Sequence, residues 1–567
     1  MELIDVWERY QRGVEYKNRI NLYSTIDENY NYFQGEQWGD TKVEGLPPPV
    51  FNFIKPVIRY KISTIMQNDT KIIYRCGNNT DPQYNELQDV ADKLTSYSET
   101  LWEKLKMDFT NEIMLQEGAI TGDGIAYFYF DEETKEVKVD LIDNTNIYPA
   151  NPNDTDLQAQ EHIIISFRRS VKSVKDEAKA NGITESDLDL ITSDTDTIEL
   201  AGANAKIEID NNDMCIVLLE MWKQDGTVWY NKCVKGLKFI SDTNTGLKLY
   251  PIGKFTWENQ KNSFFGISDV TGLIPNQDYV NTIAAMIMSS TTFTAFPKMI
   301  YDESLVENPS NQIGVAIGVK GSSQPLKNVI DYINPGSMSS DVFQMFDKTL
   351  TLTKELMGAN DGALGNVNPE NASGRSILAV MEQTALPLES VKRRYYNYLV
   401  DVALIWADMW RIYSAGGKQI DFTDENGETE AGTIDQSAFE RLMLTAKIDV
   451  GPSTRWSELS TIETLGNLLQ SKHIPFDWYV QLLPDSSGLP KKKLLDMIEQ
   501  QKQQAMQQQQ LEQQAQMQSE QQQAQQTPPN FDVDTFIESM PEEQQMQVLQ
   551  NPQMLEQMIA ERMRVQQ

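Results

Sequence analysis

The side chains that most often carry out catalysis are scarce or scattered in this sequence. Histidine serves as a general base and as a metal ligand, but the chain holds only two, His162 and His473, far apart in the sequence. The G-x-S-x-G turn of serine hydrolases is absent, and so is the phosphate-binding loop G-x-x-x-x-G-K-[ST]. The sequence therefore predicts neither an enzyme nor a bound cofactor or metal.

Carboxylates are the one reactive group present in excess. The chain carries 82 acidic against 49 basic residues, a formal net charge of −33. Pairs of carboxylates are then too common to be diagnostic, although a hydrolase that attacks polymers by acid–base chemistry would need one such pair in a cleft. The charge argues against a protein that grips nucleic acid by neutralising phosphates. It allows a protein that surrounds DNA and lets it slide, or acidity that only maintains solubility.

The composition is typical of a large folded protein, of about three or four domains by length. No run of about 18 apolar residues occurs, and the most apolar candidate, Ile283 to Met288, is too short to span a membrane. Met1 to Arg12 carries charges where a signal peptide needs an apolar block. We expect a soluble protein made in the cytoplasm.

The three cysteines are too scattered for a disulfide framework, and no C-x-x-C pair exists to hold zinc. Cys215 and Cys233 could face each other across a hairpin. Two half-buried thiols are the interpretation we favour.

The first 260 residues have the pattern of an α+β domain. A helical, aromatic-rich segment of about 35 residues ends at a turn that begins with Gly35. Further on, the spacing of Val90, Leu94, Tyr97 and Leu101 predicts an amphipathic helix. Two strand pairs follow, 125–130 with 137–141 and 215–223 with 227–234, and Asp225-Gly226 is a strong hairpin signal in the second.

The middle of the chain predicts two helices around a strand-rich insert. Ser268-Asp269 can cap a helix that continues to about Thr294, with Val280, Ala284, Ile287 and Thr291 on one face and the small residues Ala285, Ser289 and Ser290 on the others. Residues 298–333 have the pattern of short strands. Asp341 and Gln344 resemble a capping box, and the second helix would run to about Met357, with Gly358 as its stop.

A polar loop from Ala359 to Ala372, without Lys or Arg, precedes the longest periodic pattern in the chain. From Ile377 to Met409, apolar residues recur in steps of four and three. A helix of about 40 residues would span roughly 60 Å. Pro387 lies inside it and should kink it.

The C-terminal part changes character. Residues 451–490 hold short helices with proline breaks, and residues 494–526 are rich in glutamine. Disorder in a monomer is the favoured interpretation of this tract, and a coiled coil formed by several parallel copies is the alternative. Thr527-Pro528-Pro529 separates a final acidic helical piece.

Several short segments, taken in order, resemble tailed-bacteriophage portal proteins. Residues 32–38 (YFQGEQW) and 52–56 (NFIKP) are similar to the opening of that family. Residues 265–269 (FGISD), then Gln277, Asn281 and Pro297-Lys298, are similar to the segment that enters its first stem helix. Residues 358–361, 364–365 and 372–376 resemble the stretch around its channel loop. The resemblance spans roughly residues 30 to 410 and is weaker beyond them.

The resemblance implies a mixed α+β, predominantly helical portal fold. It divides the chain into a wing (1–260), a first stem helix (261–297), a β-containing clip (298–337), a second stem helix (338–358), a tunnel loop (359–372), a long kinked helix with the rest of the wing (373–450), a crown (451–493) and a Gln-rich helical or disordered C-terminal tail (494–567).

The resemblance also implies a function, that of a ring-shaped, non-enzymatic channel for packaging and ejecting double-stranded DNA. The ring would be a homo-oligomer of about twelve copies, located at the capsid vertex of the virion and assembled in the host cytoplasm. Its partners would be the terminase, the major capsid or scaffolding protein and a head-completion or tail adaptor protein, with no membrane. A different head–tail adaptor is the alternative, although adaptors are usually shorter and lack the long kinked helix.

Three sites follow from this assignment. The tunnel loop would offer DNA a weakly adhesive surface formed by Asn360, Asp361, Asn366, Asn368, Glu370 and Asn371. The alternative is that the loop is an ordinary polar turn. The basic cluster Lys392, Arg393 and Arg394 would pair with acids of the adjacent subunit, or else face the DNA. Pro387 would set the kink of the long helix.

Overall fold

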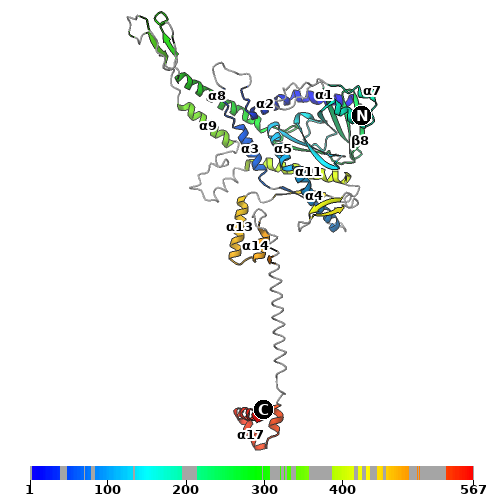
Figure 1. The fold of residues 1–567 in the computed structure, drawn as a ribbon, viewed down its shortest axis with the longest axis vertical. Coiled ribbons are helices and arrows are strands. Elements are labelled where there is room, and N and C mark those ends of the chain that lie inside the picture. Colours follow the sequence, from blue (N-terminus) through cyan, green and yellow to red (C-terminus); the bar gives the residue numbers. More distant parts are fainter. Residues whose placement is uncertain are drawn as a thin grey trace. The chain divides into compact units, whose positions relative to one another are not determined.

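The computed structural model (Figure 1) contains two compact units, Met1–Trp456 and Ser457–Gln567. Its architecture is mixed α and β with helix predominating, which confirms the predicted fold class. The structure describes residues 3–38, 48–68, 70–77, 84–131, 134–193, 213–295, 298–306, 309, 319–320, 325, 329–333, 340–356, 386–413, 419–423, 429–433, 444–450, 455–483, 494–495, 497–498 and 532–565.

Amphipathic patterns account for the helices of the first unit. Val90, Leu94 and Leu101 are buried along one side of α4, as their spacing predicts. The aromatic-rich N-terminal segment forms α1 and α2, and Gly35 ends α2 in the left-handed conformation, with a φ of 101°. The bounds are α1 Leu3–Arg19, α2 Leu22–Gln34, α3 Ile54–Ile65, α4 Tyr84–Lys104, α5 Met107–Thr121, α6 Val171–Ala180, α7 Glu185–Leu188, α8 Asp269–Ala295, α9 Ser340–Leu356 and α11 Glu389–Tyr413.

Two antiparallel sheets form the centre of this unit. A five-stranded sheet has the order β4-β5-β6-β7-β8, and a three-stranded sheet has the order β3-β2-β9. Ile163 and Ile165 of the larger sheet belong to the main core, whereas the alternate residue Ile164 packs with Val6 of α1. The bounds are β2 Asp123–Asp131, β3 Glu136–Ile142, β4 Ile147–Pro149, β5 His162–Ser170, β6 Met214–Gln224, β7 Thr227–Val234, β8 Leu237–Asn244 and β9 Ile252–Thr256.

Both predicted hairpins are present. β2 pairs with β3, and β6 pairs with β7, each antiparallel. Asp225 and Gly226 join β6 to β7 with positive φ angles of 53° and 75°. Positive φ at both central residues gives the turn a twist that matches that of the strands, which is why the Asp-Gly pair predicted it.

The three cysteines are free and buried. Cys215 lies opposite Arg169 and Cys233 lies opposite Leu218, so the two thiols do not face each other across the hairpin. Their side chains also belong to different apolar clusters. The prediction of half-buried thiols was wrong in degree, since Cys215 is 1% exposed and Cys233 is 0% exposed.

The two predicted middle helices lie side by side (Figure 1). α8 ends at Ala295, one residue beyond the predicted end, and α9 begins at Ser340, one residue before the predicted start. Between them the chain forms an antiparallel hairpin from β10, Lys298–Tyr301, and β11, Ile330–Ile333. Strands between the two helices are therefore confirmed for this hairpin, and most of the predicted insert lies outside the described residues.

α11 crosses the main core. Tyr398, Val402 and Ile405 are buried along it, as the periodic pattern predicts. Pro387 lies in a 3₁₀ turn, Leu386–Leu388, directly before the first residue of α11. The part of the predicted 40-residue helix that precedes Leu386 lies outside the described residues, so the kink stays a prediction.

The remaining elements are short. In the first unit β1, Thr70–Cys76, pairs with β14, Leu444–Val450, and β12, Gln419–Thr423, pairs with β13, Thr429–Thr433. The C-terminal helices are α13 Arg455–Gln470, α14 Phe476–Leu482, α16 Val533–Glu538, α17 Glu542–Gln550 and α18 Pro552–Val565. In the described part of the chain, none of the helices has both the length and the apolar character needed to cross a membrane.

Candidate functional site

Segments far apart in the sequence meet at the N-terminal half of α8. We call this region, from Ser268 to Asn281, the base of α8. Ser268 caps the helix, because its Oγ accepts a hydrogen bond from the amide of Val270 at 3.0 Å. The same hydroxyl donates to the carbonyl of Ala119 on α5 at 2.9 Å. The predicted cap is confirmed, and it also ties α8 to α5.

Two buried amides fasten the segment before α3 to the base of α8. The Oε1 of Gln277 accepts from the amide of Phe53 at 3.1 Å, and its Nε2 donates to the carbonyl of Phe51 at 2.9 Å. The Oδ1 of Asn281 accepts from the amide of Phe51 at 3.2 Å, and its Nδ2 donates to Gln37 at 2.6 Å. Because Gln277 and Asn281 are 0% and 3% exposed, these bonds replace water at the joint.

Charged groups hold two more helices to the base. Lys61 of α3 and Asp269 of α8 form an ion pair of 2.7 Å, with side chains only 8% and 15% exposed. Asp269 occupies the first turn of α8, where a negative charge also favours the helix dipole. Tyr32 of α2 donates to Asp278 at 2.5 Å. Among the described residues that carry the family resemblance, those of 32–38, 52–56 and 265–281 thus meet at one structural joint.

Asp123, at the start of β2, organises the strand that leads into α8. Its carboxylate, 1% exposed, accepts from the hydroxyl of Thr256 at 2.8 Å, from the amide of Gly266 at 2.8 Å and from Asn144 at 3.2 Å. Lys254 lies 3.4 Å away as its counter-charge. A buried carboxylate is stable only with such partners, and these fix the course of the chain at Gly266.

A second buried carboxylate lies on α5. Tyr30 donates a hydrogen bond to Glu117. Burial raises the pKa of Glu117 to about 7; the hydrogen bond from Tyr30 opposes this shift, and the nearby charge of Asp143 adds to it. Glu117 therefore changes charge near neutral pH inside the body of the first unit.

The other half of α8 is different. This distal half, residues 283–295, exposes Met286 and Met288 to 58% and 38%. The hydroxyls of Thr291, Thr292 and Ser289 donate to carbonyls four residues earlier in the same helix. These three hydroxyls are thus satisfied within the helix itself, and Met286 and Met288 face outward, whereas Ile283, at the start of this half, is buried.

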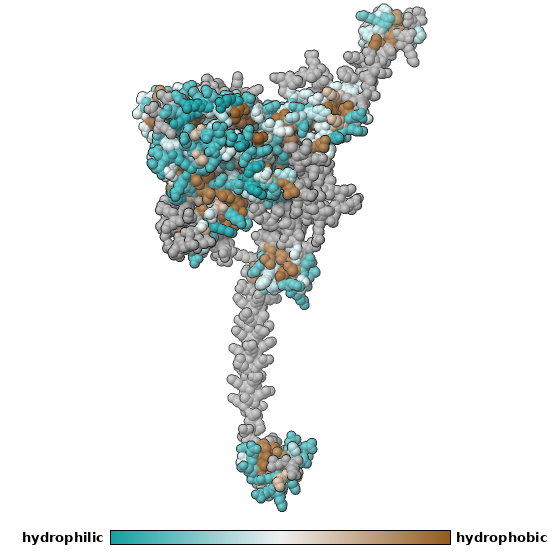
Figure 2. All heavy atoms as spheres, turned by 180° about the vertical axis from the view of Figure 1, so that it is seen from behind, coloured by the Kyte–Doolittle hydropathy of each residue, from teal (hydrophilic) through white to brown (hydrophobic). Residues whose placement is uncertain are grey.

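α9 continues this exposed apolar surface. Phe343, Met345 and Leu352 are 48%, 49% and 46% exposed. Figure 2 shows hydrophobic residues at the surface of the helix pair that leads to the β10–β11 hairpin. Large apolar groups that gather on a projecting element mark a contact surface for another molecule.

The structure describes only some of the predicted site residues, and those it describes differ in their contacts. Asn360, Asp361, Asn366, Asn368, Glu370 and Asn371, the predicted tunnel loop, lie outside the described residues. In the basic cluster, Arg394 donates to the backbone carbonyls of Thr256, at 3.1 Å, and of Trp257, which ties α11 to the chain after β9. Arg393 is exposed, and Lys392 lies 6.0 Å from the ring of Tyr396. Contacts of Lys392 and Arg393 with DNA or another subunit stay predictions.

Sequence reasoning missed the two buried charge centres, Asp123 and the Lys61–Asp269 pair. One signal was available for Asp123, which stands between Gly122 and Gly124 directly before an apolar strand. An acid at the start of a buried strand needs partners supplied by the fold. Nothing near Lys61 in the sequence indicates its distant partner.

Metal binding finds no support in the part of the chain that the structure describes. There, no group of three or more His, Cys, Asp or Glu side chains is placed to hold a metal ion.

A family model described as "Phage P22-like portal protein" matches residues 227–567, more than half of the chain. This range contains α8, α9, the hairpin between them and α11. A search among curated proteins finds no match.

Proposed function

The chain belongs to the family of P22-like phage portal proteins, and from this premise we propose that its copies form a ring-shaped channel at one vertex of the capsid. Double-stranded DNA would pass through the channel during packaging and again during ejection. The family is one of structural proteins, so the role of the chain in this proposal is assembly and not catalysis.

The observation that carries the ring is the exposed apolar surface of α8 and α9. Met286, Phe343, Met345 and Leu352 are each between 46% and 58% exposed in the single chain. In a ring, the helix pair of one copy would lie against the pair of the next and remove these side chains from water. Burying such a side chain fully contributes about 1.5–3 kcal/mol, so several around a ring would hold it together.

Passage of DNA is supported by charge. Residues 280–295 of α8 contain no ionisable side chain, and the whole chain has a net charge of −33. Tight binding to duplex DNA needs cations on the phosphates. A channel lined by this uncharged half of α8 within an acidic ring would let the duplex slide, because it offers few such contacts.

The parts of the chain take the following roles in this proposal. α8 and α9 form the stem, and the β10–β11 hairpin within residues 298–337 forms the clip, where the terminase and later the head-completion or tail adaptor protein would bind. Residues 1–260 and 373–450 form the wing, which meets the capsid or scaffolding protein. Residues 359–372 form the tunnel loop, 451–493 the crown and 494–567 the C-terminal tail.

Electron microscopy of the purified full-length protein tests the proposal directly. We expect end-on views of rings with about twelve copies and a central hole wide enough for duplex DNA, at least about 20 Å. A compact closed dimer without a channel would contradict the proposal. Monomers would call for the same imaging after coexpression with the capsid and scaffolding proteins, and rings absent there too would reject it.

A further inference from the structure

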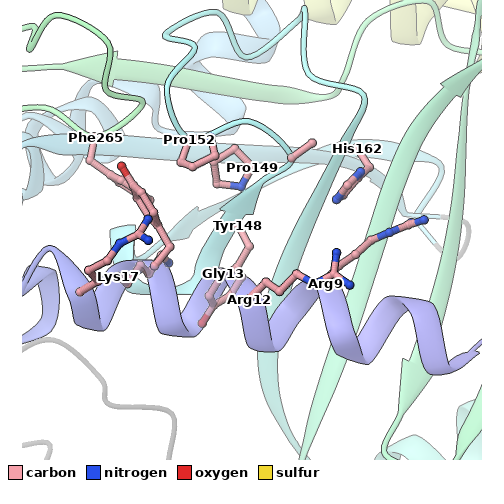
Figure 3. A pocket seen from close by; sticks show the side chains of 12 residues that line it. Arg9, Arg12, Gly13, Lys17, Tyr148, Pro149, Pro152, His162 and Phe265 are labelled. Carbon is pink, nitrogen blue, oxygen red and sulfur yellow. The ribbon is translucent and has the colours of Figure 1, made fainter.

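A cavity rich in cations lies between α1 and the edge of the five-stranded sheet (Figure 3). Its volume is about 270 Å³. We call it the cationic pocket, and it is lined by Arg9, Arg12, Gly13, Tyr16, Lys17, Arg19, Tyr148, Pro149, Ala150, Pro152, His162 and Phe265. Four of these side chains are Arg or Lys and, among the described residues, neither Asp nor Glu lines the cavity. Such a concentration of positive charge is exceptional in a chain of net charge −33.

The arginines of the pocket differ in how they are held. Arg9 is paired at 2.6 Å with Glu220, whose side chain is fully buried, so its charge is already matched. Arg12 has only a loose partner, Glu8, at 3.3 Å, and both side chains are mostly exposed to water. Arg19 is exposed and lies 5.2 Å from the ring of Tyr16. Exposed pairs contribute little, so Arg12 and Arg19 can turn toward a ligand.

Lys17 adds a buried cation to the floor of the pocket. It is 1% exposed, and its Nζ donates to the backbone carbonyls of Asn144 and Thr145 at 3.1 and 2.7 Å. The ammonium also lies 3.8 Å from the ring centroid of Tyr148. Burial lowers the pKa of Lys17. A negative charge bound in the pocket would favour its protonated form.

Apart from His162, the remaining walls consist mainly of aromatic and proline side chains. Tyr148 and Phe265 flank Lys17, and Pro149 and Pro152 form the wall opposite α1 (Figure 3). The close approach of α1 depends on Gly13, since a Cβ there would lie 2.6 Å from the ring of Tyr148. The pocket therefore combines cations at its rim with a surface suited to apolar groups.

We propose that the cationic pocket binds an acidic segment of polypeptide, with carboxylates on Arg12 and Arg19 and neighbouring apolar side chains against the aromatic and proline walls. The planar guanidinium matches a carboxylate through two parallel hydrogen bonds. This inference concerns α1 and the sheet and does not depend on the DNA channel; only the identification of the segment's source rests on the proposed ring.

A polypeptide suits the pocket better than a duplex does. Phosphates of DNA are spaced along an extended backbone, and proteins meet them with cations spread over a wide face or groove. Here the cations converge on one small cavity beside aromatic and proline side chains. The chain itself supplies abundant acidic segments, since it holds 82 Asp and Glu residues. The segment can come from another copy or from a different protein.

Fluorescence anisotropy on the full-length protein tests the proposal. The probe is a labelled, capped peptide of glutamates flanked by leucines, measured at low ionic strength beside a peptide in which glutamines replace the glutamates. The variant replaces both rim arginines, R12Q with R19Q, which are exposed and can be changed without disturbing the core. Arg59→Gln is the matched control, because Arg59 is exposed on α3 outside the pocket.

We expect the natural chain to bind the glutamate peptide and to bind the glutamine peptide much more weakly. The double variant should lose about tenfold or more in affinity for the glutamate peptide. R59Q should bind it as the natural chain does. Equal affinity of the double variant would overturn the proposal. So would a pocket that takes inorganic phosphate without preferring the peptide, or one whose arginines bind duplex DNA more tightly than the peptide.

Ring formation by the double variant identifies the source of the acidic segment. Loss of rings in the double variant would assign the acidic segment to another copy of the chain, and intact rings together with weakened peptide binding would assign it to a different protein. Both results support a peptide site.

Discussion

The side chains of the two halves of α8 make different kinds of contact. At its base, Gln277 and Asn281 are buried, and their side-chain amides form hydrogen bonds with the backbone of Phe51 and Phe53, in the segment before α3. In the distal half, Met286 and Met288 face outward, and hydroxyls such as that of Thr292 bond only to their own helix. One half is joined to its own chain, and the other half offers apolar surface to a different molecule.

One helix can thus serve both as an internal support and as an assembly surface. Buried polar bonds are costly to break, so they fix the direction in which α8 leaves the body. Exposed apolar groups cost little in the single chain and stabilise only when a partner covers them. Substitutions at the base should therefore weaken folding, and substitutions in the distal half or on α9 should weaken assembly.

The largest effect on folding is expected at Asp123, whose partners position the entry to α8. Asp123→Ala leaves Lys254 buried without its counter-charge, and the amide of Gly266 without its acceptor. We expect the free energy of unfolding to fall by about 3–5 kcal/mol. Urea unfolding followed by tryptophan fluorescence measures it.

The control for this change is Asp89→Ala on α4. Asp89 pairs with Lys93 at 2.8 Å, but its side chain is 63% exposed. Its loss should cost under about 0.5 kcal/mol. Equal effects of the two substitutions would show that the Asp123 network does not support the base.

The next effect depends on pH. The pKa of Glu117 is raised by burial from 4.5 to about 7, so the folded state favours the neutral carboxyl. The associated stability is complete below the unfolded pKa and is lost as pH rises through about 7. Glu117→Gln, which stays neutral and keeps an acceptor for Tyr30, should be more stable than the natural chain at pH 8 by on the order of 2–3 kcal/mol.

At pH 5, close to the unfolded pKa of 4.5, this advantage should fall to under about 1 kcal/mol. Urea midpoints at both values test the prediction, with Glu112→Gln, an exposed change on the same helix, as control. If the difference in stability between Glu117→Gln and the natural chain is the same at both pH values, Glu117 is not the titrating group. The distal half of α8 has no ionisable side chain, so substitutions there should not alter the pH profile.

Gln277→Ala compares the two halves within one helix. The change leaves the amide of Phe53 and the carbonyl of Phe51 without their buried partner, at a cost of about 1–3 kcal/mol. Thr292→Ala removes a hydroxyl that is exposed and bonds only to Met288, so it should change stability by no more than about 0.5 kcal/mol. Thermal midpoints give both values, and similar shifts would erase the distinction between the halves.

Local features were predictable from the sequence. The cap at Ser268 and the turn at Asp225-Gly226 depend on a few neighbouring residues, and both are confirmed. The apolar stripe of α11 was predictable for the same reason, because periodicity is a local property. Much of the fold class followed from such signals.

The joints between segments were not predictable. Gln277 bonds to Phe53 across 224 residues, and Arg394 bonds to Thr256 across 138 residues. No local pattern reveals such partners, because they are set by how the sheets and helices pack. For this reason Arg394 was grouped with two other cations as one basic cluster, although its guanidinium is used inside its own chain.

The smallest effect on folding, and the largest on assembly, is expected on α9. Phe343 and Met345 are each about half exposed, so replacing both with serine should lower the stability of the single chain by no more than about 1–2 kcal/mol. The same double substitution should abolish or sharply reduce rings, as counted in electron micrographs at matched protein concentration. Phe109→Ser is the control, since Phe109 is 62% exposed and belongs to α5, not to the helix pair. If the α9 variant forms rings as readily as the natural chain, the exposed apolar surface is not the contact between copies, and the division of α8 into a supporting half and an assembling half fails.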